Sequence, residues 1–308
     1  MSMQFLPNLS QNLTKLLEIK KNYDVIINVD KDNNKKEFFA HSIILETRST
    51  YFENALSNVS ARKKSNIFIL DYPDISANVF DILIRYIYGG AIDLVHEEPT
   101  NILNLLSSCE QFKLEELYDQ IQNYLIEHHQ FWIFQNLVLI QKISFKYTEF
   151  TKLQNYWMTI VCEQPEILFD DADFTSVDKA TLLSLYKMED LNMEENKLWD
   201  HIIRWGKAQH AELPKDITNW KTNDFNILKK TLDDFTPHIR FYDIPSEDFC
   251  YKVMPYSEII PNDLYQDLSK YYLVPDWQPK FNNLRPRKAD NPNNPNDSKL
   301  INGEQAAP

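Results

Sequence analysis

Three residues whose types match a hydrolase triad lie close together near the N-terminus. Asp24 begins one apolar run, and His41 and Ser42 stand side by side at the end of the next. A nucleophile elbow needs a small residue on each side of its serine, because the turn is tightly strained. Ser42 stands between His41 and Ile43, which is wrong on both sides. We therefore expect Asp24 and His41 to form a structural corner, and we predict no catalytic residue and no enzyme activity.

Residues that hold metals or cofactors do not occur in the required patterns. The seven histidines are scattered, and the adjacent pair at 128–129 is typical of a helix end. The acidic run FDDADF at 169–174 lacks the alternating oxygen ligands of a calcium loop. With 4 glycines in 308 residues, the chain has no glycine cluster for a phosphate-binding loop. We expect no metal and no cofactor.

The three cysteines and the charge indicate the cellular setting. Cys109, Cys162 and Cys250 form neither a CxxC pair nor a disulfide framework, so we expect three small core residues in a reducing compartment. A formal charge of −13 argues against nucleic acid as a partner. There is no signal peptide and no apolar run of about 18 residues, so we expect no membrane contact. The predicted location is the cytoplasm, with the nucleus as a second possibility.

Apolar periodicity divides the chain into a mixed head and a helical remainder. A helix at 10–20 places Leu13, Leu16 and Leu17 on one face, which must be buried somewhere. Strands are expected at 24–29, 37–41, 66–70 and 91–95, with two short helices at 42–57 between them. A further helix at 75–90 ends at Gly89–Gly90, because glycine readily adopts the left-handed backbone conformation that terminates a helix. From residue 100 to about 273 the pattern predicts helices only.

The order and spacing of these elements resemble a BTB (POZ) domain over residues 23–129. In that family the histidine closes a structural corner and catalyses nothing, which agrees with the analysis of His41 above. The resemblance implies an α+β fold, with a short mixed sheet capped by helices. It is carried by Asp24–Val25, Phe39-Ala40-His41, Leu45…Arg48-Ser49…Phe52 and Phe80…Leu83…Tyr86-Ile87-Tyr88-Gly89.

The helical half resembles a BACK domain, an all-α companion of BTB domains in kelch-type adaptors. Independently of any family, Leu198, Trp199, Ile202 and Trp205 have the spacing of core residues, and Asn192 followed by Glu195 resembles a capping box. Residues 232–268 resemble the BACK continuation of fungal proteins, and DSKLIN at 297–302 resembles the start of a TLDc domain. The BACK signature at 180–209 comprises Leu182, Leu183, Leu185, Asp190-Leu191-Asn192-Met193, Glu195, Leu198, Ile202 and Trp205.

The predicted organisation has four parts. Residues 1–22 are a dimerisation helix, 23–129 the BTB domain, 130–274 the BACK domain and 275–308 a disordered linker or tail, which is rich in Asn and Pro. We predict a dimer interface at Leu13, Leu16, Leu17 and Tyr51, because the leucine stripe has no other obvious burial site and two-fold dimers are the commonest oligomers. The resemblance implies a cullin contact at Phe52, Leu56, Ser57, Asn58, Phe131 and Phe134.

The resemblance implies a non-enzymatic homodimeric adaptor that connects an unknown substrate protein to a cullin-RING ubiquitin ligase, with cullin-3 as the scaffold. Two departures from the family pattern matter. Ser42 occupies a position that is commonly basic, which argues against recruitment of transcriptional corepressors. Leu56-Ser57-Asn58 lacks the glutamate of the apolar-x-Glu motif of cullin binders, which favours the alternative of a homo-oligomeric scaffold without a ubiquitin role. Transcriptional regulation ranks last, because no zinc finger or basic region accompanies it.

Overall fold

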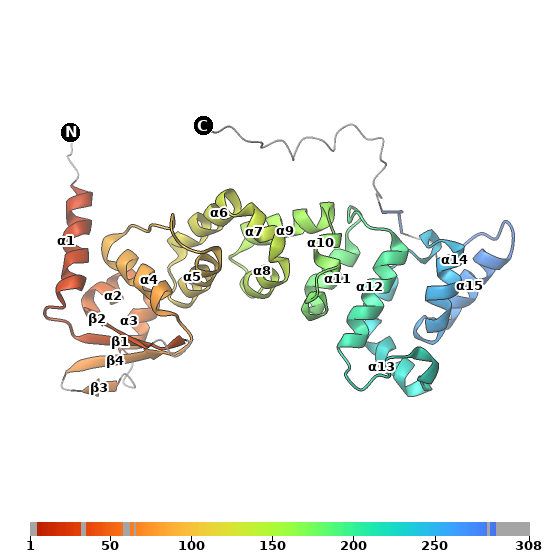
Figure 1. Cartoon of the computed structure of the whole chain (residues 1–308), viewed down its shortest axis with the longest axis horizontal. Coiled ribbons are helices and arrows are strands. Elements are labelled where there is room, and N and C mark those ends of the chain that lie inside the picture. The colour runs from red at the N-terminus through yellow and green to blue at the C-terminus, as the bar shows by residue number, and fades with distance from the viewer. Residues whose placement is uncertain (1–4, 32–34, 58–61, 65, 282–283, 288–308) are drawn as a thin grey trace. The chain divides into compact units, whose positions relative to one another are not determined.

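The computed structural model describes residues 5–31, 35–57, 62–64, 66–281 and 284–287, and the chain forms two compact units (Figure 1). Residues 1–136 with 143–155 form the first unit, and residues 137–142 with 156–308 form the second. Helices α8 (Leu137–Ser144) and α9 (Thr151–Glu163) each contribute to both units. The first unit carries a sheet, and the described part of the second is helical. This agrees with the predicted α+β head followed by a helical region.

The first unit is built on a mixed four-stranded sheet with the order β2-β1-β4-β3. β1 (Val25–Val29) pairs antiparallel with β2 (Lys36–Ala40) and parallel with β4 (Ile67–Tyr72), and β3 (Arg62–Lys64) runs antiparallel to β4. In β1, Val25, Ile27 and Val29 are completely buried, because alternate side chains of a strand point to the same face. Residues 91–95 form no strand, contrary to the prediction.

Helices α2 (Ser42–Arg48), α3 (Thr50–Ser57) and α4 (Ala77–Gly89) lie on one side of this sheet (Figure 1). An aromatic cluster fills the space beneath them. The rings of Phe52 and Phe112 stack with centroids 5.1 Å apart, and Tyr72 and Phe80 meet Phe112 edge-on at 5.2 and 5.8 Å. Burial of large aromatic rings contributes much of the stability of a small core, so this cluster holds the strands to the helices.

Helix α1 (Leu6–Ile19) packs along α4, and glycine permits the close approach. A Cβ atom at Gly89 would lie only 2.8 Å from Thr14 Oγ1, and Ser10 Oγ donates a hydrogen bond to the Gly89 carbonyl at 2.5 Å. The next residue, Gly90, has φ = 67° and ends α4 in the left-handed conformation that favours glycine. The predicted glycine stop is therefore confirmed.

Further helices complete the first unit, and the second unit has a core of large aromatic residues. Trp205 Nε1 donates to the Val177 carbonyl at 2.9 Å, and Tyr186 Oη donates to the Leu198 carbonyl at 2.6 Å. Leu198, Trp199, Ile202 and Trp205 are all buried, as predicted. The remaining α-helices are α5 (Pro99–Gln111), α6 (Tyr118–His128), α7 (Gln130–Gln135), α10 (Glu166–Phe169), α11 (Lys179–Lys187), α12 (Glu195–Ala208), α13 (Thr222–Leu232), α14 (Ser246–Asp248) and α15 (Asn262–Leu273).

Two local predictions are wrong. Helix α12 begins at Glu195 with Glu194 as its N-cap, and the Glu195 carboxylate binds arginine side chains instead of closing a capping box with Asn192. Cys109 and Cys162 are buried as expected, but Cys250 is exposed, because its side chain lies on the outer face of the π-helical turn Phe249–Val253.

The predicted linker or tail at 275–308 is corrected for its first part. Trp277 Nε1 and the Lys280 backbone N–H both donate to the Asp267 carboxylate of α15, at 2.9 and 2.8 Å. Arg287 is buried in the second unit. Paired polar groups and the Trp277 ring thus hold the described residues 277–281 and 284–287 to the second unit. Residues 288–308, including the TLDc-like stretch, lie outside the described residues.

Candidate interaction surface

The corner between β2 and α2 is held by a network of buried and half-buried polar groups. The Asp24 carboxylate accepts hydrogen bonds from the backbone N–H and the hydroxyl of Ser42, at 2.7 and 2.6 Å. It thereby satisfies a free N–H group at the start of α2. His41 lies in the same corner but has other partners: its Nδ1 is 2.7 Å from Tyr88 Oη, and its Nε2 is 2.8 Å from the Lys21 carbonyl oxygen.

These contacts assign a structural role to the corner. The Lys21 carbonyl only accepts, so His41 Nε2 carries the proton and Nδ1 accepts from Tyr88. Burial raises the pKa of Tyr88 above its usual range, which keeps its hydroxyl protonated and able to donate. The Ser42 hydroxyl donates to Asp24 and not to His41. A nucleophile and its base must be joined by a hydrogen bond, so this arrangement does not activate Ser42.

Replacing Asp24 with alanine is expected to lower the free energy of unfolding of the first unit by about 1–3 kcal/mol, because the Ser42 N–H and hydroxyl lose their acceptor. Urea denaturation followed by circular dichroism measures the loss, and Asp30→Ala, at an exposed position just after β1, is the matched control. A fluorophosphonate probe should not label Ser42 in the wild type. Labelling of Ser42 would contradict the structural role.

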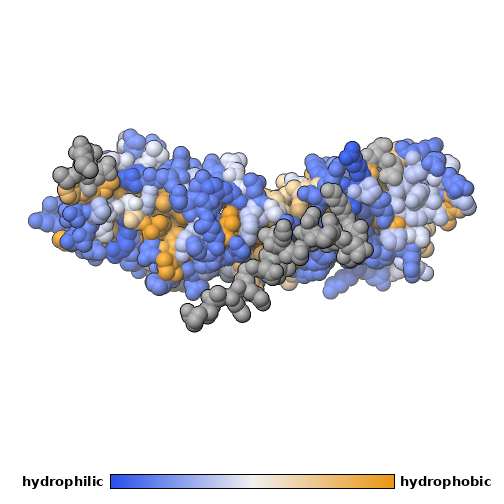
Figure 2. Space-filling view, turned by 90° about the horizontal axis from the view of Figure 1, so that it is seen from above, coloured by the Kyte–Doolittle hydropathy of each residue, from blue (hydrophilic) through white to orange (hydrophobic). Residues whose placement is uncertain are grey.

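An apolar groove of about 710 Å³ lies where α1 meets α2 and α4. Leu6 and Leu9 of α1 line it from one side and Ile43 of α2 lines it from the other, and all three are exposed. Phe5 extends the exposed apolar surface at the start of α1. Figure 2 shows hydrophobic surface at the end of the chain that carries α1. Ile43 is 73% exposed, so the groove presents large aliphatic side chains to the solvent.

One end of this groove is charged and hydrogen-bonded. Arg48 of α2 forms an ion pair with Glu116 at 2.8 Å, and its guanidinium lies 5.5 Å from the centroid of the Tyr86 ring. The Tyr86 hydroxyl donates to the same Glu116 carboxylate. Burial, followed by this bond to Glu116, raises the pKa of Tyr86, so the phenol stays neutral. An apolar floor with a polar end is the usual composition of a protein–protein interface.

The residues predicted for the dimer interface are only partly in this groove. Leu13 lines it, but Leu13, Leu16 and Leu17 are half-buried on the helix that packs against α4. Their apolar stripe is therefore partly buried within the chain, contrary to the expectation that it has no burial site there. Tyr51 lies at the edge of the aromatic core, 5.3 Å from Phe112 between ring centroids. The exposed residues Phe5, Leu6, Leu9 and Ile43 were missed because periodicity does not distinguish an outer apolar face from an inner one.

The residues predicted for the cullin contact divide into two groups. Phe52 is completely buried and Leu56 is 4% exposed, so both belong to the core and cannot contact a partner. This corrects their assignment. Ser57 is exposed, and Asn58 lies outside the described residues. In α7, Phe131 is 76% exposed and Phe134 is half-buried. Phe131 is therefore the accessible aromatic residue of the predicted set.

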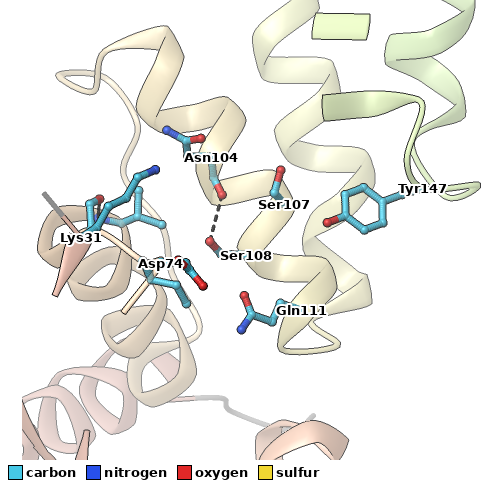
Figure 3. A pocket seen from close by; sticks show the side chains of 10 residues that line it. Lys31, Asp74, Asn104, Ser107, Ser108, Gln111 and Tyr147 are labelled. Atoms are coloured by element: carbon cyan, nitrogen blue, oxygen red, sulfur yellow. Dashed lines mark hydrogen bonds between the residues drawn. The ribbon is translucent and has the colours of Figure 1, made fainter. Parts of the chain in front are cut away.

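A small polar pocket of about 130 Å³ lies between α5 and the turn before α4 (Figure 3). It has room for a few water molecules. Lys31 and Asp74 contribute opposite charges, and the Ser108 hydroxyl donates to the Asn104 carbonyl of its own helix at 2.9 Å. This use of the hydroxyl argues for a hydration site and not a reactive one. In the part of the chain that the structure describes, no group of three His, Cys, Asp or Glu side chains could hold a metal ion.

Comparison with known proteins identifies the first unit. Residues 13–129 match the family model of the BTB/POZ domain. BTB/POZ domain-containing protein 9 of Rattus norvegicus is 26% identical over 219 residues, which cover 68% of this chain and 33% of that protein. Kelch-like protein 40a of Danio rerio is 24% identical over 211 residues, which cover 68% of this chain and 32% of that protein. The chain thus spans about a third of the length of these relatives. No described helix is long and apolar enough to cross a membrane.

Proposed function

Because residues 13–129 form a BTB/POZ domain, which is a protein-interaction module, we propose that this chain is a non-enzymatic, dimeric substrate adaptor for a cullin-RING ubiquitin ligase. The observation that carries the proposal is the pairing of this domain with two separate exposed apolar sites on the same unit. One is the groove of α1 and α2, and the other is Phe131 on α7. Similarity to Kelch-like protein 40a supports the adaptor role.

The groove is the proposed dimer interface. A two-fold dimer places the same surface of each protomer against its partner, and exposed leucine and isoleucine side chains on α1 and α2 suit such self-association. A dimer presents two surfaces for cullin docking and two for substrate binding. Weak individual contacts therefore gain affinity from the higher effective concentration of the second site. This location differs from the half-buried stripe of Leu13, Leu16 and Leu17, which α4 already covers in part.

The double variant Leu9→Asp/Ile43→Asp is expected to convert the dimer into a monomer, because two carboxylates would be desolvated on each side of the interface. Light scattering should report twice the mass of one chain for the wild type and a single mass for the variant. Val95→Asp is the matched control, since Val95 is an equally exposed apolar residue outside the groove. If the double variant keeps the dimer mass, the interface lies elsewhere.

Cullin docking is proposed to use Phe131, and Ser57 is the other exposed residue among the described residues of the predicted contact. Binding energy at interfaces concentrates in a few aromatic anchors, and Phe131 presents a large aromatic ring that is 76% exposed. Phe131→Asp is expected to weaken binding to purified cullin-3 by about tenfold or more without changing the dimer mass. Calorimetry measures the affinity, with Val95→Asp again as the control. An unchanged affinity would exclude Phe131 from the contact.

The alternative is a homo-oligomeric scaffold without a ubiquitin role. The stretch Leu56-Ser57-Asn58 favours it, because the glutamate of the cullin-binding motif is absent and Leu56 is buried. The same calorimetry separates the two functions. A wild-type chain that dimerises but has no measurable affinity for cullin-3 is a scaffold.

The second unit is proposed to act as a BACK domain that supports a substrate-binding segment. The buried positions of its signature, among them Leu191, Met193 and Leu198, support this assignment. The substrate would be an unidentified protein, and the cytoplasm, with the nucleus as a second location, is the proposed site of action. The formal charge of −13 makes nucleic acid an unsuitable partner.

A further inference from the structure

Three charged side chains meet in the interior of the second unit. Arg287 Nε donates to Glu195 Oε1 at 2.6 Å, and Arg240 Nη1 lies 3.6 Å from the same oxygen. The side chains of Arg287 and Glu195 are only 2% and 3% exposed. Removing two charges from water costs several kcal/mol per ion, and their mutual attraction offsets this only when further hydrogen bonds are made. The surroundings of Arg287 must therefore supply such bonds.

The C-terminal end of α11 provides them. Arg287 Nη2 donates to the Tyr186 carbonyl at 2.7 Å, and Nη1 donates to the carbonyl of Met188, the C-cap residue of α11. The last carbonyls of a helix lack partners within the helix and carry the negative end of its dipole. Together with the Glu195 carboxylate at the start of α12, these carbonyls surround the planar guanidinium group of Arg287 on three sides. A guanidinium matches this geometry and an ammonium does not, because only the former has fixed, divergent donors.

Part of the pocket is held by groups outside the segment that carries Arg287. Glu195 Oε2 accepts from the Arg240 backbone N–H at 3.2 Å, and the Arg240 side chain donates to the His238 carbonyl at 3.3 Å. The accepting carbonyls of α11 belong to a regular helix end. A cleft of about 390 Å³ lined by Glu195, Asn196, Pro245 and Arg287 adjoins the site. A small molecule can therefore reach the pocket from solvent.

Arg287 also ends a segment whose other attachments are few. Arg240 Nε donates to the Arg285 carbonyl at 2.6 Å, and Trp277 and Lys280 bind the Asp267 carboxylate. The Arg285 side chain itself is exposed. Within the described residues from 275 onward, Arg287 is the one buried charged residue, so its loss should release the segment more than any other single change.

We propose that Glu195 and the terminal carbonyls of α11 form a guanidinium-binding site, and that its occupation by Arg287 locks residues 284–287, together with residues 277–281 before them, onto the second unit. When the lock is open, these residues are free to extend. The ligand of the site is an arginine side chain, supplied by the same chain.

The test uses the whole chain with Arg287→Ala, with and without millimolar methylguanidine. Hydrogen exchange in the peptide containing Lys280, whose N–H is bound to Asp267, is expected to become at least tenfold faster in the variant. Methylguanidine should refill the pocket and raise the melting temperature of Arg287→Ala, while the wild type gains nothing. A melting temperature of Arg287→Ala that methylguanidine leaves unchanged or lowers would overturn the proposed site.

Two further variants complete the test. Arg285→Ala is the matched control, because it removes an exposed arginine two residues away and should leave exchange and melting temperature unchanged. Arg287→Lys is expected to open the lock as alanine does, since an ammonium cannot serve Glu195 and both carbonyls. If lysine holds the segment as well as arginine does, the site is not selective for guanidinium and the proposal is wrong. If Arg287→Ala does not fold by itself, recovery of folded protein on refolding with methylguanidine supports the site, and failure to recover it contradicts it.

Discussion

Replacing Leu56 with aspartate is expected to unfold the first unit instead of removing one contact from an intact surface. Leu56 is 4% exposed at the end of α3, and Phe52, one turn earlier, stacks on Phe112. An aspartate there would bury a carboxylate without a partner and leave a cavity, which together cost about 4 kcal/mol or more. Since a domain of this kind is stable by about 5–15 kcal/mol, most of that margin would be lost.

Circular dichroism and tryptophan fluorescence together measure this effect. Five of the six tryptophans, Trp157 to Trp277, lie in the second unit, so fluorescence follows that unit while the sheet signal follows the first. Ser57→Asp is the matched control, because the next residue is exposed and should tolerate the charge within about 0.5 kcal/mol. If the Leu56→Asp variant melts within a few degrees of the wild type, Leu56 is not a core residue and is again available as a surface contact.

Removing the carboxylate of Glu195 is the second change with a large expected effect. In Glu195→Ala, the guanidinium groups of Arg240 and Arg287 lose the carboxylate that they share in the folded second unit. Breaking a buried ion pair by removing one partner typically costs about 3–5 kcal/mol. Urea denaturation followed by tryptophan fluorescence should show this loss in the transition of the second unit, while the sheet of the first unit is unaffected.

Glu194→Ala is the appropriate control for this experiment. Glu194 is exposed and pairs with Lys197 at 3.6 Å on the helix surface, which contributes well under about 1 kcal/mol. Equal destabilisation by the two substitutions would mean that Glu195 acts only as a residue of the first turn of α12. A loss confined to Glu195→Ala would assign the effect to its two arginines.

The amino-acid sequence was sufficient for the elements whose signal is local. The β-branched run of Val25–Val29, the two helices of 42–57 and the glycine end of α4 each follow from propensity and periodicity, and all occur in the structure. The short strand Arg62–Lys64 was missed, because its side chains are basic and only pairing with β4 makes it a strand. The predicted strand at 91–95 fails for the same reason, since an apolar run becomes a strand only where a neighbour offers hydrogen bonds.

Only the tertiary structure decided which apolar and charged side chains are exposed to solvent and which are buried. Leu56 and Phe131 are both large apolar residues in short helices, yet Leu56 is 4% exposed and Phe131 is 76% exposed. Arg287 lies in a stretch whose composition predicts disorder, but carbonyls and a carboxylate from residues about a hundred positions earlier order it. Composition sums local preferences along the chain, whereas burial and ion pairing depend on which distant segments the fold brings together. The sequence therefore determined the class of the protein and its helices, and the fold determined its surfaces.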